Sequence, residues 1–439
     1  MRLRFLAVAF LVLVFNYAAF AQEQITLEQA ITLALEKNYD VKTAENAAAS
    51  TQLNKDYVWG AFIPQIDATA STLRTLNDQE LRFADESRNN TGESESVNTN
   101  ANVQLTWTLF DGTRMFATRQ RINTIDRESE LLLKNQMSNT IYSVIVNYYS
   151  IVRQKQQLKA IQEQMSVGEE RVKLAERKLE VGTGIKPELL QARVDYNAQR
   201  AQVIQQESAI QQLKQQLNVL TGMQLPEVFE VADTILLNLN LDTSALMNNV
   251  ENTNFALMAV RENMNSLELA IRENRANYFP RLNFNAAYSW NENDNRVLLN
   301  PFGATYNLSN GFNYGFTVSL PILNGLNNRR LTQQSKITYS RQQIVYNQSK
   351  ANVNTGLNNA LVDYENAKRI LLIEEETIGL AKENLFIALE GFKRGVTTFI
   401  ELRTAQQSLA DAYNRLIAAR YNTKVAETTL LSLSGALLK

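Results

Sequence analysis

The sequence has no cysteine and no histidine among its 439 residues. This absence excludes nucleophile–base pairs and metal sites that use these side chains, and it excludes disulfide bonds. Proline and glycine are scarce, with 6 and 16 residues, which favours long uninterrupted elements. An excess of charge is also missing, because 44 Lys and Arg residues balance 45 Asp and Glu residues. A nucleic-acid-binding protein needs a basic surface, so nucleic acid is not an expected partner.

The start of the chain has the pattern of a secretory signal. Arg2 and Arg4 are basic, residues 5–15 are all apolar, and residues 19–21 offer a small-residue cleavage pattern. We therefore expect a signal peptide over 1–21, with a retained N-terminal anchor as the alternative. Further along, no stretch reaches the roughly 18 apolar residues of a membrane helix, so any membrane-spanning part is expected to consist of β-strands.

Two segments far apart in the chain repeat each other. VGTGIKPELLQAR (181–193) aligns with RGVTTFIELRTAQ (394–406) at an offset of 213 residues. Earlier in each half an offset of 216 carries Pro64 onto Pro280. Agreement at so many positions indicates a tandem duplication.

The duplication divides the chain into three parts. We expect a first repeat over 22–222, a linker over 223–242 and a second repeat over 243–439. Each repeat contains one glycine-bearing tip turn, at 181–185 and at 394–398.

Four segments alternate between apolar and polar residues with the period of a β-strand. They are expected at about 64–76, 98–110, 280–292 and 311–322. Aromatic residues on one side and uncharged polar residues on the other are typical of transmembrane barrel strands. A half-buried strand of a soluble sandwich shares this alternation and is the alternative. The polar segments 77–98 and 291–310 are expected to be solvated loops.

The alternation assigns the two faces of a barrel. The apolar face is expected to meet lipid through Trp107, Phe284, Trp290 and Phe316. The polar face is expected to meet the lumen through Asn102, Gln104, Asn283 and Thr317.

Long helical patterns follow each pair of strands. Residues 113–180 and 326–393 contain no proline and are each 68 residues long, which is about 100 Å as an α-helix. In the returning segments large apolar residues recur every seven positions from Leu189 to Leu217, and leucine and alanine do so in the second repeat, with Thr423 as an exception. This pattern predicts coiled-coil-like packing. Asn38 and Asn254 are equivalent by the repeat and are expected to interrupt the helices that open each half.

The order of these elements resembles that of the TolC-type outer membrane efflux proteins. ITLEQAITLALEKNYDVKTAE (25–45) is similar to the opening helix of that family, and LTWTLFDGTR (105–114) is similar to its strand exit. The paired VG and RG turns resemble its two periplasmic helical hairpins. The similarity covers essentially all of residues 24–436.

The resemblance implies a mainly helical fold with transmembrane β-structure. Each internally duplicated protomer would give four strands to a trimeric twelve-stranded β-barrel, and its coiled-coil-like helices would form a periplasmic α-barrel. Residues 223–242 would belong to a belt around that tunnel. The implied partners are further copies of the chain as a homotrimer, outer-membrane lipid, a periplasmic adaptor (membrane fusion protein) and an inner-membrane transporter. No cofactor or metal is implied.

The resemblance also places acidic residues at the periplasmic entrance. Glu188 and Glu401 lie at equivalent positions just after the tip turns. They match acidic positions that hold the closed entrance of the family and line a cation-sensitive constriction. The alternative is that both carboxylates only stabilise the first turn of a helix through its dipole.

Other entrance positions depart from the family pattern. Phe392 lies where the family can place a tyrosine, so a hydroxyl link is missing. Thr397 lies where a basic partner can sit, and Thr404 lies at the second acidic position. Arg394 and Arg403 are the candidates to replace the missing base.

The tip turns themselves contain Gly182, Gly184 and Gly395. Glycine just after a helix end accepts a positive φ, and Pro187 suits the first turn of the next helix. The resemblance makes the same turns the expected docking site for the adaptor.

The expected function is a passive outer-membrane exit duct of a tripartite efflux or type I secretion system. It would carry small molecules or polypeptides from the periplasm or the inner-membrane pump to the outside, with a long periplasmic portion. The sequence has no catalytic constellation and no GxxxxGK[ST] phosphate loop, so we expect no enzyme and an energy supply from a partner. The alternative is a periplasmic coiled-coil scaffold or adaptor without a pore.

Overall fold

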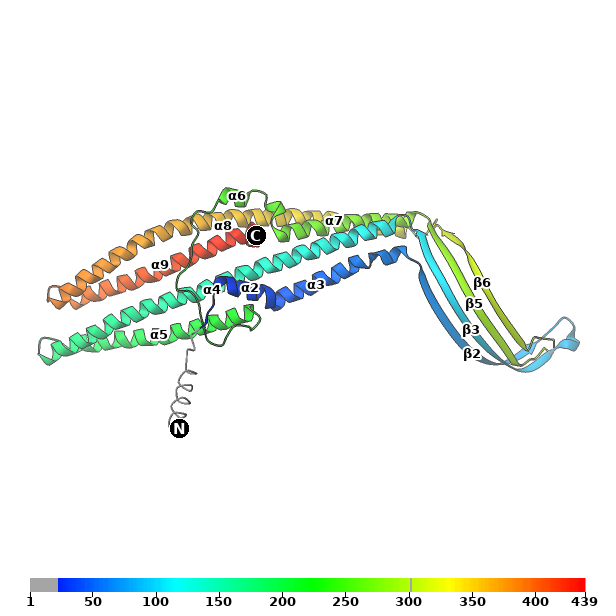
Figure 1. The fold of residues 1–439 in the computed structure, drawn as a ribbon, viewed down its shortest axis with the longest axis horizontal. Helices are drawn as coiled ribbons and strands as arrows, with labels where there is room; N and C mark the ends of the chain where they lie inside the picture. The colour runs from blue at the N-terminus through cyan, green and yellow to red at the C-terminus, as the bar shows by residue number, and fades with distance from the viewer. Residues whose placement is uncertain (1–22, 301, 439) are drawn as a thin grey trace, which may run out of the picture. The chain divides into compact units, whose positions relative to one another are not determined.

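The computed structural model describes residues 23–300 and 302–438 (Figure 1). The expected signal peptide over 1–21 lies outside the described residues. None of the described helices combines the length and the apolar character that a membrane-spanning helix needs.

The two repeats have matching long elements. The first repeat contains β1 (Glu23–Gln24), α2 (Leu27–Lys37), α3 (Tyr39–Asp56), η1 (Val58–Phe62), β2 (Gln65–Leu81), η2 (Glu86–Arg88), β3 (Asn90–Phe110), α4 (Arg114–Glu180) and α5 (Lys186–Leu220). The linker and the second repeat contain β4 (Phe229–Glu230), α6 (Thr243–Met247), η3 (Val250–Asn252), α7 (Phe255–Arg275), η4 (Ala276–Tyr278), β5 (Arg281–Val297), β6 (Tyr306–Ser319), α8 (Asn327–Lys393) and α9 (Phe399–Leu433).

The long helices of the two repeats have equal lengths. The helices α4 and α8 have 67 residues each, and α5 and α9 have 35 residues each. The long helices begin and end within one residue of the predicted segments 113–180 and 326–393. At 1.5 Å per residue each of them is about 100 Å long.

The chain folds into two compact units that do not coincide with the two repeats. One unit contains residues 23–48, 129–259 and 347–438, and the other contains residues 49–128 and 260–346. Each repeat therefore contributes to both units, and α4 and α8 run through both of them.

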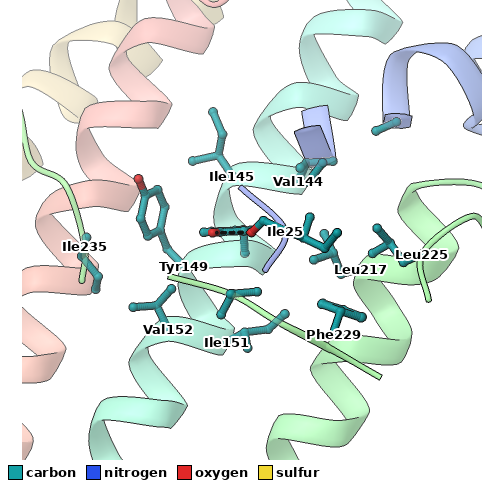
Figure 2. Close-up of a cluster of buried hydrophobic side chains, with 14 of the residues drawn as sticks. Ile25, Val144, Ile145, Tyr149, Ile151, Val152, Leu217, Leu225, Phe229 and Ile235 are labelled. Atoms are coloured by element: carbon teal, nitrogen blue, oxygen red, sulfur yellow. Dashed lines mark hydrogen bonds between the residues drawn. The ribbon is translucent and has the colours of Figure 1, made fainter. Parts of the chain in front are cut away.

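In the first unit a buried cluster joins the α4–α5 hairpin to the linker (Figure 2). Val144 and Ile151 of α4, Leu217 of α5 and Phe229 of the linker pack together there. The strand β1 pairs in parallel with β4 beside this cluster. The hydroxyl of Tyr148 donates to the carbonyl of Ile25 at 2.9 Å, which ties the start of the described chain to α4.

Polar side chains of both helical hairpins hold the linker in place. Lys214 of α5 and Lys155 of α4 each lie 2.8 Å from the carboxylate of Glu230. Burial opposes the ionisation of Glu230, but the hydrogen bonds from both lysines outweigh it and hold the pKa of Glu230 below its usual range. Further along the linker, Tyr364 donates to the carbonyl of Asn238 at 2.7 Å, which attaches the linker to α8.

Asparagine side chains interrupt the short helices of each repeat, as the sequence predicted. Asn38 ends α2 with extended backbone dihedral angles, and its amide donates to the carbonyl of Leu220 at 2.9 Å. Asn254 precedes α7 and donates to the carbonyl of Leu433, also at 2.9 Å. Each side-chain oxygen accepts an N–H of the helix that follows, so one residue caps a helix and holds the end of a second one.

The second unit contains an antiparallel sheet with the strand order β2-β3-β5-β6. The four predicted strands are present, but the predicted loops at 77–98 and 291–310 are wrong, because β2 continues to Leu81 and β3 begins at Asn90. Likewise β5 continues to Val297 and β6 begins at Tyr306. Polar residues sustain the longer ladder through cross-strand contacts, such as the ion pair between Arg74 and Glu95 at 2.9 Å.

The strand register places the two sets of alternating side chains on opposite faces. Trp107 pairs with Phe284, which pairs with Phe316, so the three rings form one row across three strands. The rings of Phe284 and Phe316 are 5.2 Å apart, and Trp290 shares their face of β5. On the other face Ser289 donates to Asn102 at 3.2 Å. Gln104, Asn283 and Thr317 share that polar face.

Candidate functional site at the tips of the helical hairpins

The two tip turns have the same backbone conformation. Gly182 follows α4 with φ +76°, and Gly395 follows α8 with φ +77°. An added Cβ at either glycine would meet no atom within 4 Å, so the backbone angle and not crowding requires glycine. Both turns therefore end a helix in the left-handed conformation and reverse the chain.

In each tip the turn also passes close to the end of the preceding helix, and a glycine makes this approach possible. The glycine lies in the turn in the first repeat and in the helix in the second. A Cβ at Gly184 would lie 2.9 Å from Lys178 Cβ, so the turn can pass the helix only without a side chain. In the second repeat the equivalent of Lys178 is Gly391, and the equivalent of Gly184 is Thr397. A Cβ at Gly391 would collide with the Thr397 side chain. Thr397 therefore occupies space that the other repeat gives to a lysine.

Glu401 forms a capping box at the start of α9. Its carboxylate accepts the Thr398 N–H at 2.7 Å, and its own N–H donates to the Thr398 hydroxyl at 3.3 Å. The hydrogen bonds with the backbone and side chain of Thr398 hold the pKa of Glu401 below its usual range. The carboxylate is exposed and ionised at neutral pH, and within one protomer it serves the helix start.

Glu188 lies in the first turn of α5 and is half-buried. Pro187 precedes it near the helix start, and the preceding N-cap residue, Ile185, offers no side-chain cap. In the described part of the chain the Glu188 carboxylate takes part in no ion pair. A carboxylate in the first turn is also stabilised by the helix dipole. Glu188 and Glu401 therefore share a position at a helix start, but only Glu401 forms a capping box.

Phe392 belongs to a buried cluster at the end of α8. Its ring lies 6.4 Å from that of Phe399, and Leu402 and Ala405 of α9 complete the cluster. The ammonium of Lys178, at the end of α4, lies 4.0 Å from the centre of the Phe392 ring. The Phe392 ring is therefore a packing residue that also meets a cation from the other hairpin.

Arg403 contributes to an ionic network that joins the two hairpins. Its Nε lies 3.4 Å from Asp195 Oδ2, and Asp195 also pairs with Arg171 at 2.5 Å. Arg171 donates to Gln406 at 2.9 Å and stacks over Phe399 at 5.1 Å. Helices α4, α5 and α9 are therefore connected by one carboxylate between two guanidinium groups.

Sequence reasoning missed Arg171 and Asp195, although one signal was present for the arginine. Val167, Arg171, Leu174 and Lys178 follow the four-three spacing of an apolar coiled-coil stripe. A cation on such a stripe must either reach solvent or find a partner. Nothing in the local sequence marked Asp195 as a partner, because its contact with Arg403 joins residues that are 208 positions apart.

A polar cavity lies between the hairpins beside this network. Its volume is about 600 Å³, and its lining includes Gln199, Gln206, Gln406, Asp195, Arg171 and Tyr413. Amides are the most frequent side chains of the lining, and charged side chains of both signs lie among them, with Arg171, Asp195 and Arg403 on the side of the ionic network. Among the residues that the structure describes, no group of three or more carboxylates is arranged to hold a metal ion.

Comparison with sequence families finds one that covers both repeats. The family described as outer membrane efflux protein matches residues 30–223 and 246–436. Among curated protein sequences, none matches the chain significantly.

Solved structures share the fold over nearly the whole chain. The CmeC outer membrane channel of Campylobacter jejuni is 16% identical, with a TM-score of 0.79 over 93% of this chain and 85% of that one. The MtrE outer membrane channel of Neisseria gonorrhoeae, in an open state, is 16% identical, with a TM-score of 0.74 over 94% of this chain and 89% of that one. The outer membrane protein VceC of Vibrio cholerae is 14% identical, with a TM-score of 0.75 over 93% and 96%.

Proposed function

The chain belongs to the outer membrane efflux protein family, and from this membership we propose that it is the outer-membrane exit duct of a tripartite efflux or type I secretion system. The match of the family to both repeats carries the proposal, because it includes the strands and both helical hairpins together. The duct passes small molecules or polypeptides from the periplasm or an inner-membrane pump to the outside. A periplasmic adaptor connects it to that pump.

The sheet supports a trimer. Its outer strands β2 and β6 each have one unpaired edge, and unpaired backbone groups are costly in lipid. Four strands are too few to close a barrel around an open lumen, whereas three copies supply twelve. The homotrimer therefore satisfies the edges that a single copy leaves open.

The two faces of the sheet suit lipid on one side and water on the other. The row of Trp107, Phe284 and Phe316, with Trp290 on the same face, would meet outer-membrane lipid. Asn102 and its polar neighbours would line the lumen.

The tips of the hairpins would form the periplasmic entrance and the adaptor contact. Gly182 and Gly395 permit the left-handed backbone conformation that reverses the chain, and Gly184 lets the first turn pass close to the end of α4, so each tip presents a short exposed turn to a partner. The sequence has no phosphate-binding loop, so the energy for transport comes from the inner-membrane partner.

Glu188 and Glu401 would set the ion preference of that entrance. Threefold symmetry would bring six carboxylates, two from each of three copies, around one axis, where they attract cations and repel anions. The low pKa of Glu401 supports this role, because its charge persists into mild acid. Phe392, Thr397 and Arg403 would act behind these carboxylates by packing the tip and by holding it through Asp195.

Conductance of the purified protein in a planar lipid bilayer tests the duct and its gate together. We expect heat-resistant trimers from the outer-membrane fraction that form cation-selective pores with low resting conductance. A soluble periplasmic species without pore activity would instead identify the scaffold alternative.

The gate is tested by Glu188→Gln combined with Glu401→Gln. We expect the cation preference to fall, because these side chains lose their charge but keep their size. Glu169→Gln is the control, since Glu169 is an exposed acid of α4 that pairs with Lys173 in its own helix. Unchanged selectivity and unchanged resting conductance in the double variant would show that both glutamates only stabilise helix starts and have no role in the gate.

A further inference from the structure

The four long strands divide their charged side chains unequally between the two faces of the sheet. On the face of the Trp107 row, the register places eight of them: Arg74, Asp78, Glu80, Glu93, Glu95, Glu292, Asp294 and Arg296. On the polar face it places two, Asp67 and Arg281, which lie near the first residues of β2 and β5. The strand β6 contains none. Charge is therefore concentrated on the face that also carries the aromatic rings, and the polar face is nearly free of it.

Amides and hydroxyls occupy the polar face instead. One row crosses all four strands and consists of Ser71, Asn100, Asn291 and Ser309. All four residues are exposed in the single copy. The neighbouring row adds the amides of Asn98, Asn293 and Asn307. These two rows give the middle of the sheet a polar surface that carries no charge.

Such a surface suits a ligand that both donates and accepts hydrogen bonds. A side-chain amide has donors and an acceptor oxygen, and a hydroxyl group also acts in both ways. The hydroxyl groups of a saccharide have the same double capacity, so each of them can find a partner at Asn100 or Ser71. An apolar solute would find few contacts, because Leu73 is the one large apolar side chain of this face among the described residues from Gln65 to Thr75 and those paired with them.

Two other classes of cargo match this face less well. Ions are selected by rings of charged side chains, but in the row of Asn100 and in the rows on either side of it the described polar face carries no charge. A polypeptide could form hydrogen bonds through its backbone, but its charged side chains would meet no countercharge in these rows. Uncharged, hydroxyl-rich chains are the class in which every polar group has a partner on this face.

We propose that the polar face of the sheet is a charge-free wall that binds and passes uncharged, hydroxyl-rich solutes, with saccharide chains as the chemical class of cargo. The proposal rests on the duct proposed above and names the cargo that its barrel accommodates. In three copies the row of Asn100 and Asn291 recurs three times around the lumen. A saccharide chain can therefore exchange the hydrogen bonds of one row for those of the next as it moves.

Blocking of the ion current through the purified protein in a planar lipid bilayer tests the cargo class. A linear dextran oligosaccharide is compared with polyethylene glycol of the same hydrodynamic radius, because the repeating unit of the glycol accepts hydrogen bonds but donates none. We expect the oligosaccharide to interrupt the current for roughly ten times longer, as one or two additional hydrogen bonds would cause.

Paired variants locate the binding to the wall. Asn100→Ala with Asn291→Ala removes two amides of one row and should shorten the oligosaccharide interruptions several-fold, with no change for the glycol. Asn310→Ala is the control, because Asn310 is an exposed amide of β6 that pairs with Trp290 on the other face. It should leave both interruptions unchanged.

A charge placed on each face tests which face the cargo meets. Asn100→Lys should shift the reversal potential toward anion preference, because it sets a ring of positive charge in the lumen. Ser309→Lys lies in the same row on another strand and should act alike, so a folding failure of one variant leaves the other informative. Asn310→Lys should cause no shift. A shift with Asn310→Lys and none with the other two would overturn the wall.

The remaining outcomes separate this proposal from the duct. Pores that the oligosaccharide and the glycol block for equal times overturn the cargo class but leave the duct intact. Longer interruptions by a charged peptide than by the oligosaccharide assign the wall to polypeptides and overturn the proposal as well. Absence of any pore from the natural chain contradicts the duct, and the wall with it.

Discussion

Asp195→Asn should open the tip where the two hairpins meet. The Arg171 side chain is only 5% exposed, and Asp195 is its charged partner. Arg171 Nε is already buried without a hydrogen-bond partner in the described structure. The substitution preserves the size of residue 195 but removes its negative charge. The buried guanidinium of Arg171 is then left with amide partners and no carboxylate.

The magnitude follows from the burial of the pair. Removing one partner of a buried ion pair destabilises a protein by roughly 3–5 kcal/mol. The Asp195 side chain is 20% exposed, so water screens part of the interaction, and we expect about 2–3 kcal/mol. Since 1.4 kcal/mol corresponds to a factor of ten, local opening should increase roughly 30- to 150-fold.

Hydrogen–deuterium exchange of the purified protein in detergent measures this opening. Amides of α4 and α5 near residues 171 and 195 should exchange faster, whereas amides of the sheet should not change. The control is Glu176→Gln, because the pair of Glu176 with Arg193 joins the same two helices at the surface. A surface pair contributes about 0–1 kcal/mol.

Two outcomes would refute the reasoning. One is an effect of Asp195→Asn no larger than that of Glu176→Gln. The other concerns the double variant Arg171→Met with Asp195→Leu, which removes both charges and so leaves no unpaired guanidinium. We expect its amides to be more protected than those of Asp195→Asn, and equal protection in the two variants would refute the reasoning.

Three further predictions concern helix ends. Asn38→Ala leaves the Leu220 carbonyl without its donor and should lower the free energy of unfolding by about 1–3 kcal/mol, measured by thermal unfolding in detergent. The pKa of Glu401 is depressed by its bonds with Thr398, so this stabilisation is present above the unfolded pKa and is lost as the pH falls through the folded pKa. Amides at the start of α9 should therefore lose protection in acid, relative to the intrinsic exchange rate at each pH, and Glu401→Gln should not show this loss. Gly182→Ala forces alanine into a left-handed conformation and should loosen the first tip turn by roughly 1–2 kcal/mol, measured by exchange, whereas unchanged exchange would contradict the strain.

Much of the fold could be predicted because the sequence repeats periodic patterns. Uninterrupted helical segments located α4 and α8 to within one residue, and alternation located all four strands. The strand ends could not be located, because residues such as Asp78 and Glu93 pair across the ladder without any apolar alternation. Where both faces of a hairpin are polar, alternation no longer distinguishes a strand from a loop.

The candidate site was less predictable for a different reason. The positions of Glu188 and Glu401 follow from the repeat, and their placement at helix starts follows from local sequence. The partner of Arg403 depends on how α9 is rotated against α5, and one sequence contains no information on that rotation. Coiled-coil stripes predict that helices pack, but they do not specify which polar residues meet beside the stripe.

The two tips use the same crowded crossing in different ways. In the first tip a Cβ at Gly184 would meet backbone atoms of Lys178 and Leu179 as well as the Lys178 Cβ, whereas in the second tip the Thr397 side chain lies beside Gly391. The two tips are therefore not interchangeable residue by residue. A chimeric tip that combined the lysine of one repeat with the threonine of the other would place two side chains in a crossing that holds one.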